Sequence, residues 1–343
     1  MKKLKKADIL SLSEEVLIKE YVREVFENIR LYKEELDYEI IDILLRTSIE
    51  NKLSIETIMM YGAKAEYLFG RGDINQAVEL FRKAIKLAEK KDNNLVVLFM
   101  VELADLYYRE GMLPEAEAEY KLAESYANKQ DIDVRTIFKY NYWRGIMLNS
   151  INKHFEAREL FHTAYQYALT IEQKTAAMLN IGLTYKKEQR FEEAMDIYKK
   201  LLSLYGEKDL IGRGAVYNNI AVIEMERGCL KEALKNSIKA ITLVALTTDI
   251  NNKVKFYHTY TQVRLMMGGE AVCSEYFEVL LSTIGRQVNK KFIVADIMSI
   301  ADMIPAHMLE RLIVVITEMA QASYNEHYIN DLHSCAEYIR KKI

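Results

Sequence analysis

Histidine, cysteine and carboxylate side chains are the groups in this sequence that could perform chemistry. The closest two histidines at near-helical spacing, His327 and His333, are six residues apart, whereas two metal ligands on one helix lie three or four apart. The cysteines, about 40 and 60 residues apart and without a CxxC pair, favour free, reduced thiols. We therefore predict no metal site, no cofactor and no catalytic residue. The residues considered are His154, His162, His258, His307, His327, His333, Cys229, Cys273 and Cys335.

Motifs of common enzyme classes are also missing. The sequence contains no GxGxxG, GxxxxGK[ST], HExxH or GxSxG. Carboxylates such as Glu115 and Glu117 alternate with lysines such as Lys121, which is typical of a solvated helix face. These observations predict a protein that is not an enzyme.

The composition indicates a folded, almost entirely helical chain. Of 343 residues, 50% are hydrophobic and 28% charged, while glycine (13) and proline (2) are too scarce for a chain rich in strands and turns. The formal charge of -3 provides no overall attraction to nucleic acid or to an anionic membrane. No apolar stretch is long enough for a membrane span or signal peptide. We expect a cytoplasmic protein without membrane contact.

A phrase that begins at Gly72, GDINQAVELFRKA, returns at a step of about 40 residues. Each copy has one position for glycine, here called the slot, and three apolar or small residues at fixed distances after it. The slots are Gly72, Gly111, Asn152, Gln189, Gly228 and Gly268. The residues that follow them are Ala77, Phe81, Ala84; Ala116, Tyr120, Ala123; Ala157, Phe161, Ala164; Ala194, Tyr198, Leu201; Ala233, Ser237, Ala240; and Cys273, Phe277, Leu280.

A small residue also precedes each slot by seven positions, on a predicted upstream helix. Small side chains there allow two helices to cross closely. These residues are Ala65, Ala104, Gly145, Gly182, Ala221 and Thr261.

This pattern resembles the tetratricopeptide repeat (TPR), a helical hairpin, over about residues 55 to 285. The resemblance implies an all-α fold, a right-handed TPR superhelix (α-solenoid) of about six hairpins whose first helices line a concave surface. We assign residues 1–54 to an N-terminal helical cap or effector segment, 55–288 to the repeats and 289–343 to C-terminal capping helices. Because TPR folds serve many functions, the fold alone does not identify the ligand.

The two ends are predicted to be helical as well. Residues 12 to 50 form two helices, the first with Val16, Leu17, Tyr21, Val22, Val25 and Phe26 on one face and the second with Ile40, Ile41, Ile43, Leu44 and Leu45. Residues 289 to 343 form about three, the second of which starts near Pro305. The apolar stretch 305 to 321 either caps the repeats or is the seam of a homodimer.

Asparagine occurs in two successive repeats at the same level of the predicted concave surface, nine residues before the slot. An amide has both donors and an acceptor, so Asn180 and Asn219 are predicted to bind the main chain of an extended peptide regardless of its side chains. The alternative is that asparagine is simply frequent at this point of the motif.

The chemical character of the residues at the other lining positions differs from repeat to repeat. Glu102 and Asp105 are predicted to receive the basic or amino-terminal end of the peptide, and Trp143 and Tyr142 to take a side chain. Alternatively, Trp143 fills a gap between first helices. The remaining predicted lining residues are Lys139, Asn149, Lys186, Lys187, Asn218, His258 and Gln262.

The repeat length near 40 and the inner-helix motif Tyr217-Asn218-Asn219-Ile220-Ala221 resemble the cytoplasmic peptide-pheromone receptors of Gram-positive bacteria, the group of Rap, NprR, PlcR and the arbitrium receptors. The resemblance implies a non-catalytic signalling regulator of quorum sensing. Its partners would be a short peptide in the groove and a protein effector whose interaction the peptide switches.

Two alternatives stay open. Many such receptors begin with a DNA-binding helix-turn-helix, which the first 50 residues do not resemble, so direct DNA binding is disfavoured. A DNA-binding regulator would have to use the basic arm of Lys2, Lys3, Lys5 and Lys6. The second alternative is a plain TPR assembly scaffold without a small ligand.

Overall fold

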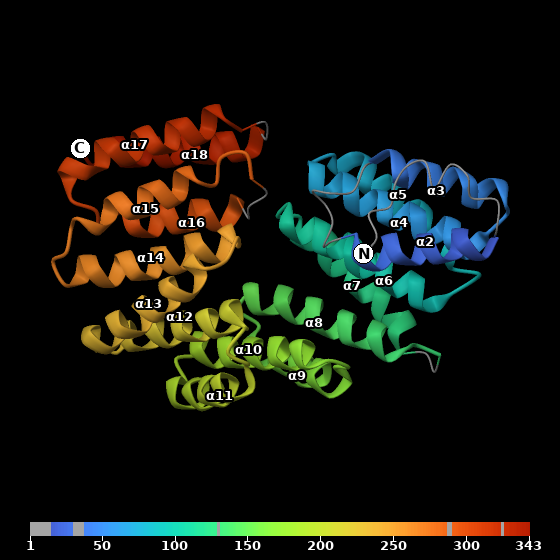
Figure 1. Cartoon of the computed structure of the whole chain (residues 1–343), viewed down its shortest axis with the longest axis horizontal. Coiled ribbons are helices and arrows are strands. Elements are labelled where there is room, and N and C mark those ends of the chain that lie inside the picture. Colours follow the sequence, from blue (N-terminus) through green and yellow to red (C-terminus); the bar gives the residue numbers. More distant parts are fainter. Residues whose placement is uncertain (1–14, 30–37, 129–130, 287–289, 324–325) are drawn as a thin grey trace. The chain divides into compact units, whose positions relative to one another are not determined.

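The computed structural model describes residues 15–29, 38–128, 131–286, 290–323 and 326–343, and every regular element among them is a helix. The chain divides into two compact units, Met1–Ala177 and Met178–Ile343 (Figure 1).

The helices of the first unit are α2 (Glu15–Asn28), α3 (Tyr38–Glu50), α4 (Ser54–Arg71), α5 (Ile74–Ala88), α6 (Asn93–Arg109), α7 (Leu113–Ala127), α8 (Val134–Ser150) and α9 (His154–Tyr167). Helix α10 (Ile171–Lys187) begins in the first unit and ends in the second. The second unit continues with α11 (Phe191–Leu204), α12 (Leu210–Glu226), α13 (Leu230–Ala245), α14 (Ile250–Met266), α15 (Val272–Leu281), α16 (Lys290–Ala301), α17 (Ala306–Gln321) and α18 (Glu326–Arg340).

Six hairpins follow one another from α4 to α15, as the repeats predict. In each, the residues five, nine and twelve positions after the slot lie on the second helix, and none of these eighteen side chains is more than 1% exposed. Because these positions recur every three or four residues, they form one face of the second helix. The all-α TPR fold predicted from the repeats is confirmed.

The slots have left-handed backbone geometry in all six repeats. Glycine has φ values of 76° to 87° there, and Asn152 and Gln189 have 63° and 58°. The residue after each slot donates its N–H to the carbonyl five positions back, as Asp73 does to Leu68 at 3.0 Å and Arg190 does to Tyr185 at 2.9 Å. This is the Schellman ending of a helix, which explains why glycine is preferred at the slot.

In the third and fourth repeats, the small residue of the first helix makes room for the aromatic ring of the second helix. A Cβ added at Gly145 would lie 2.7 Å from a ring carbon of Phe161, and one at Gly182 would lie 2.6 Å from a ring carbon of Tyr198. Larger side chains at these positions would therefore separate the two helices of the hairpin. The predicted close crossing is confirmed in these two repeats.

The start of each first helix from the second repeat to the sixth has a capping side chain, a periodic feature that the sequence analysis did not use. Asp92, Asp133, Asp209 and Asp249 each accept a hydrogen bond from a backbone N–H in the first turn. At the start of α10, Thr170 Oγ1 accepts from the Gln173 N–H at 3.2 Å, and Gln173 Oε1 accepts in return from Leu169 N–H at 2.7 Å. These caps set where each first helix begins.

Helices α2 and α3 confirm that two helices precede the repeats, although the predicted face of α2 is partly wrong. Val22 and Val25 are buried, but Val16 and Leu17 are 66% and 38% exposed, and Ile18 and Ile29 complete the buried stripe instead. The stripe runs at i, i+4, i+7 and i+11, so it follows the helical period from Ile18. The basic arm lies outside the described residues.

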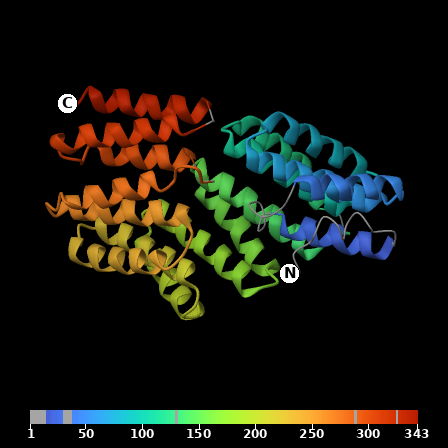
Figure 2. The same ribbon diagram turned by 45° about the horizontal axis from the view of Figure 1, so that its top comes forward.

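The three C-terminal helices are present, and α17 begins after Pro305 as predicted. Leu309, Leu312, Ile316 and Met319 belong to a core cluster that includes residues of α15, α16 and α18. Figure 2 shows these C-terminal helices side by side at one end of the second unit. The buried part of the apolar face of 305–321 is therefore covered by the chain's own helices, as the capping interpretation predicts, and the homodimer stays a prediction. The assigned boundaries after residues 54 and 288 stay a prediction.

Candidate functional site

The predicted site residues all lie on first helices of the hairpins, and both compact units contain some of them. The first unit contains Glu102, Asp105, Lys139, Tyr142, Trp143 and Asn149, and the second contains Asn180, Lys186, Lys187, Asn218, Asn219, His258 and Gln262.

The two carboxylates of the first group are buried and already face cations. The Asp105 carboxylate forms an ion pair with the Arg109 guanidinium at 2.8 Å, and the Glu102 carboxylate lies 4.0 Å from the ammonium of Lys139. Thus Glu102 and Lys139, predicted to form an acidic end and a basic centre, lie next to each other on α6 and α8. A ligand's amino group would have to compete with these internal cations.

The aromatic residues of the first group form a connected set. The ring of Tyr142 stacks on that of Phe138 at 5.4 Å, and it meets the edges of Trp143 at 5.4 Å and of Phe161 at 6.1 Å. Tyr142 is also packed against the apolar cluster around Phe138 and Ala164. Its packing within the hairpin favours a structural role for Tyr142, while Trp143 lies at the margin of the set and is half-buried.

Asn149 is fixed within its own hairpin. Its Oδ1 lies 2.7 Å from Nδ1 of His154, the first residue of the second helix α9. This contact spans the turn of the third repeat, so it also explains a role for His154 that the sequence had not indicated.

Asn219 lies at the centre of the second group and is only 2% exposed. Its Nδ2 donates to the carbonyl of Ala215 at 3.0 Å, and its Oδ1 accepts from the ammonium of Lys186 at 2.7 Å. A primary amide has two donor hydrogens and two acceptor lone pairs, so one of each remains. The side chain is therefore held in a fixed orientation with capacity for a further donor and acceptor contact.

The two other asparagines differ in exposure. Asn180, at the same level one repeat earlier, is half-buried, whereas Asn218 is 1% exposed and its Oδ1 has no hydrogen-bond partner. Burying an amide oxygen without a hydrogen-bond donor costs folding free energy. Helix α12 therefore carries a buried acceptor that has no donor.

Lys186 contacts Asn219, and two further lysines of the second unit lie near Lys186. Lys186 and Lys187 are the last two residues of α10. Lys255 lies on α14, one helical turn before Thr259. Thr259 occupies in the sixth repeat the level that Asn219 occupies in the fifth. Burial and the positive charges of Lys255 and Lys187 lower the pKa of Lys186 to about 7. Lys255 was missed by the sequence analysis, although it lies thirteen residues before its slot, as Lys139 does in the third repeat.

His258 belongs to a polar cluster that joins α14 to α16. Its Nε2 lies 2.9 Å from Ser299 Oγ and its Nδ1 lies 3.9 Å from Asp296 Oδ1. Burial lowers the pKa of His258 to about 4, and burial raises the pKa of Asp296 to about 6 against the opposing charge of Lys255. At neutral pH the imidazole is neutral and the carboxylate ionised. Asp296 and Ser299 lie outside the repeats, so no repeat position could have indicated them.

Gln262, one turn after His258 on α14, is half-buried, and Lys187 is exposed. The structure therefore places Asn219, Lys186, Lys187 and Lys255 in one region of the second unit, with His258 and Asp296 on the side of α16.

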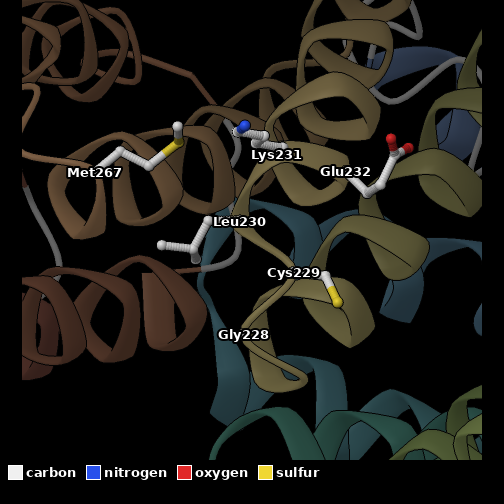
Figure 3. A pocket seen from close by; sticks show the side chains of 6 residues that line it. All are labelled: Gly228, Cys229, Leu230, Lys231, Glu232 and Met267. Atoms are coloured by element: carbon white, nitrogen blue, oxygen red, sulfur yellow. The ribbon is translucent and has the colours of Figure 1, made fainter.

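A separate shallow cavity of about 490 Å³ lies at the turn of the fifth hairpin (Figure 3). It is lined by Gly228, Cys229, Leu230, Lys231, Glu232 and Met267, none of which belongs to the predicted site. Within the described ranges, no three His, Cys, Asp or Glu side chains gather as a metal site would require. No described helix has the length and apolarity needed to cross a membrane.

Comparison with known proteins identifies the repeats independently. The tetratricopeptide repeat model matches residues 60–91 and 175–208, which are the first hairpin, α4 and α5, and the fourth, α10 and α11. The TPR repeat-containing protein MJ1428 of Methanocaldococcus jannaschii is 25% identical over 243 residues, or 68% of this chain. The chain spans 38% of the length of that relative.

Among solved structures, a Rap protein complexed with Competence and Sporulation Factor matches with a TM-score of 0.61 and 17% identity, over 98% of this chain and 90% of its own. Aspartyl phosphate phosphatase F from Bacillus subtilis matches with a TM-score of 0.60 and 16% identity, over 98% and 87%. The apo form of RapI matches with a TM-score of 0.58 and 16% identity, over 83% and 99%. The chain therefore contains tetratricopeptide repeats, and its fold resembles that of the Rap proteins.

Proposed function

We propose that this protein is a non-catalytic regulator that binds a short peptide along the first helices of its repeats and thereby changes its interaction with a protein effector. We propose a cytoplasmic location and a role in quorum sensing of the kind that the receptor resemblance implies.

The observation that carries the proposal is the extent of the structural match. The Rap complex and phosphatase F each cover 98% of this chain, so the likeness includes the helices on both sides of the repeats. One of these structures was solved with Competence and Sporulation Factor bound. A protein built on the same plan throughout is a better candidate for a receptor than one that shares only the repeats.

The inner helices of the second unit support peptide binding chemically. The Asn219 amide retains one donor and one acceptor while Lys186 and Ala215 hold it in place. Asn180 is half-buried at the equivalent level of the previous repeat. Two amides a repeat apart can pair with peptide N–H and C=O groups, which is recognition independent of the peptide's side chains.

The proposal is tested by affinity selection from a pool of random hexapeptides, with retained peptides counted by mass spectrometry. Wild type is compared with Asn180→Ala and Asn219→Ala. The matched control is Asn236→Ala on the second helix α13, because Asn236 Nδ2 donates to the carbonyl four residues back at 2.9 Å, as Asn219 does.

We expect peptides selected by wild type to lose about five- to a hundredfold in affinity in each inner variant, since truncation leaves a peptide amide and carbonyl unsatisfied at about 1–3 kcal/mol. Asn236→Ala should bind as wild type does. Equal affinity of all four proteins would contradict the asparagine assignment, and retention of no peptide would contradict peptide binding altogether.

Two further measurements separate the alternatives. A DNA-binding regulator would bind DNA with a steep salt dependence that is lost on deletion of residues 1–10. An assembly scaffold would retain a protein partner while no peptide raised its melting temperature. Because one structural neighbour is named a phosphatase, release of phosphate from an aspartyl-phosphate protein is the assay that would contradict a non-catalytic role.

A further inference from the structure

Three lysines of the second unit lie close to one another without a carboxylate partner among the described residues. No carboxylate within the described part of the chain lies at ion-pair distance from Lys186, Lys187 or Lys255, whereas Lys64 and Arg227, for example, pair at 2.6 and 2.7 Å. Lys186 Nζ donates instead to a neutral group, Asn219 Oδ1, at 2.7 Å.

The fold brings these lysines to one place. Lys186 of α10 reaches Asn219 on α12, and α12 packs against α14, the helix of Lys255. The Lys255 carbonyl accepts a hydrogen bond from Thr259 Oγ1 at 3.3 Å, so Lys255 lies one turn before Thr259 on the same side of α14. Thr259 occupies on α14 the level that Asn219 occupies on α12. Two inner helices, α10 and α14, thus contribute to one basic patch, defined here as Lys186, Lys187 and Lys255.

The nearest acidic groups do not neutralise this patch. Glu226 acts on Lys186 and Asp296 acts on Lys255 only through space, beyond the 4.0 Å of an ion pair. Asp296 is shared with His258, whose Nδ1 lies 3.9 Å away. Both carboxylates therefore lie beyond ion-pair distance from these lysines, and the mutual repulsion of the ammonium groups would be relieved by an anionic ligand.

We propose that the basic patch of Lys186, Lys187 and Lys255 binds a carboxylate of the peptide ligand, and that Asn219 positions Lys186 for this contact. The inference rests on the proposed peptide binding and specifies the ligand as a peptide with a carboxylate near this end of the groove. The low pKa of Lys186 is consistent with an ammonium that lacks an anion in the free protein. The carboxylate can be the peptide's C-terminus or an acidic side chain.

The experiment uses N-acetylated random hexapeptides in two forms, one with a free C-terminal carboxylate and one with a C-terminal amide. The variant replaces Lys186, Lys187 and Lys255 by glutamine, which removes three charges while an amide can still donate to Asn219. The matched control replaces Lys199, Lys200 and Lys235 of the second helices α11 and α13 by glutamine, so the net charge is the same. Circular dichroism and thermal unfolding check that both variants are folded.

We expect wild type and the control to retain free-acid peptides at least tenfold better than amidated neutral ones, and the patch variant to lose that preference. Selective retention of amidated peptides rich in Asp or Glu would identify a side-chain carboxylate as the source and equally support the patch. Equal retention of acid and amide forms by wild type, without enrichment of acidic residues, would overturn only this inference. If no form is retained, peptide binding fails and the inference fails with it.

Discussion

Gly182 shows how packing within a repeat restricts the residue type at a single position. A Cβ at this position would lie 2.6 Å from the Tyr198 ring, closer than side chains approach one another. Gly182→Ala should destabilise the chain by about 1–3 kcal/mol, because the ring and both helices must shift. Urea unfolding measures the change. Gly206→Ala, where an added Cβ meets nothing within 4 Å, is the control and should stay within about 0.5 kcal/mol of wild type.

Lys186 makes stability depend on pH. Its pKa in the folded protein is about 7, below its ordinary value of 10.5, so the folded state disfavours the charged form. The destabilisation is complete below pH 7 and diminishes as pH rises towards 10.5, because the unfolded chain then binds more protons than the folded one. Lys186→Met should therefore raise the melting temperature more at pH 6 than at pH 9.

Lys200→Met, on the exposed side of α11, is the control for this measurement and should show no such difference between the two pH values. An equal gain for Lys186→Met at both values would mean that its ammonium is ordinarily solvated.

At the scale of the element, the turn between the two helices of a repeat depends on left-handed backbone geometry. Gln189 has φ 58° without the freedom of glycine, and Gly228 has φ 76°. Gln189→Gly should stabilise the chain by about 1 kcal/mol, and Gly228→Ala should destabilise it by a similar amount, since an L-residue pays about 1–2 kcal/mol in this conformation. Thermal unfolding of the two variants tests the pair. Changes of the same sign would show that the turn relaxes to another geometry.

At the scale of the whole molecule, α17 distinguishes an internal core from a surface between copies of the chain. Ile316 is fully buried in the C-terminal cluster, whereas Val314 on the same helix is 55% exposed. Ile316→Asp should destabilise the chain by about 3 kcal/mol or more, because it buries an unpaired carboxylate. Val314→Asp should change stability by no more than about 0.5 kcal/mol.

Light scattering of the two variants adds the second readout. We expect Val314→Asp to leave the molecular mass of wild type unchanged. A fall to half the mass would show that a second copy contacts the exposed side of α17.

Local chemistry made the hairpins predictable. The slot, the small residue seven positions before it and the three residues after it lie within about 20 residues of one another, and each has a backbone or packing requirement that only a few residue types meet. The six slots, the eighteen buried positions and the start of α17 could therefore be predicted from the amino-acid sequence. The exposure of Val16 and Leu17 could not be predicted, because an apolar residue type does not show at which residue a helix begins to contact its neighbours.

The site depended on contacts between helices that the chain separates by about 40 residues. The sequence by itself determined that Asn180 and Asn219 occupy equivalent inner positions and that Lys186 and Lys187 lie near them. Only the tertiary structure decided that Lys186 uses the Asn219 amide, that Glu102 faces Lys139, and that Asp296 reaches His258 from beyond the repeats. The helical period specifies which face of its helix a side chain occupies. Its partner depends on how neighbouring helices pack and on which charged groups are buried in the same place.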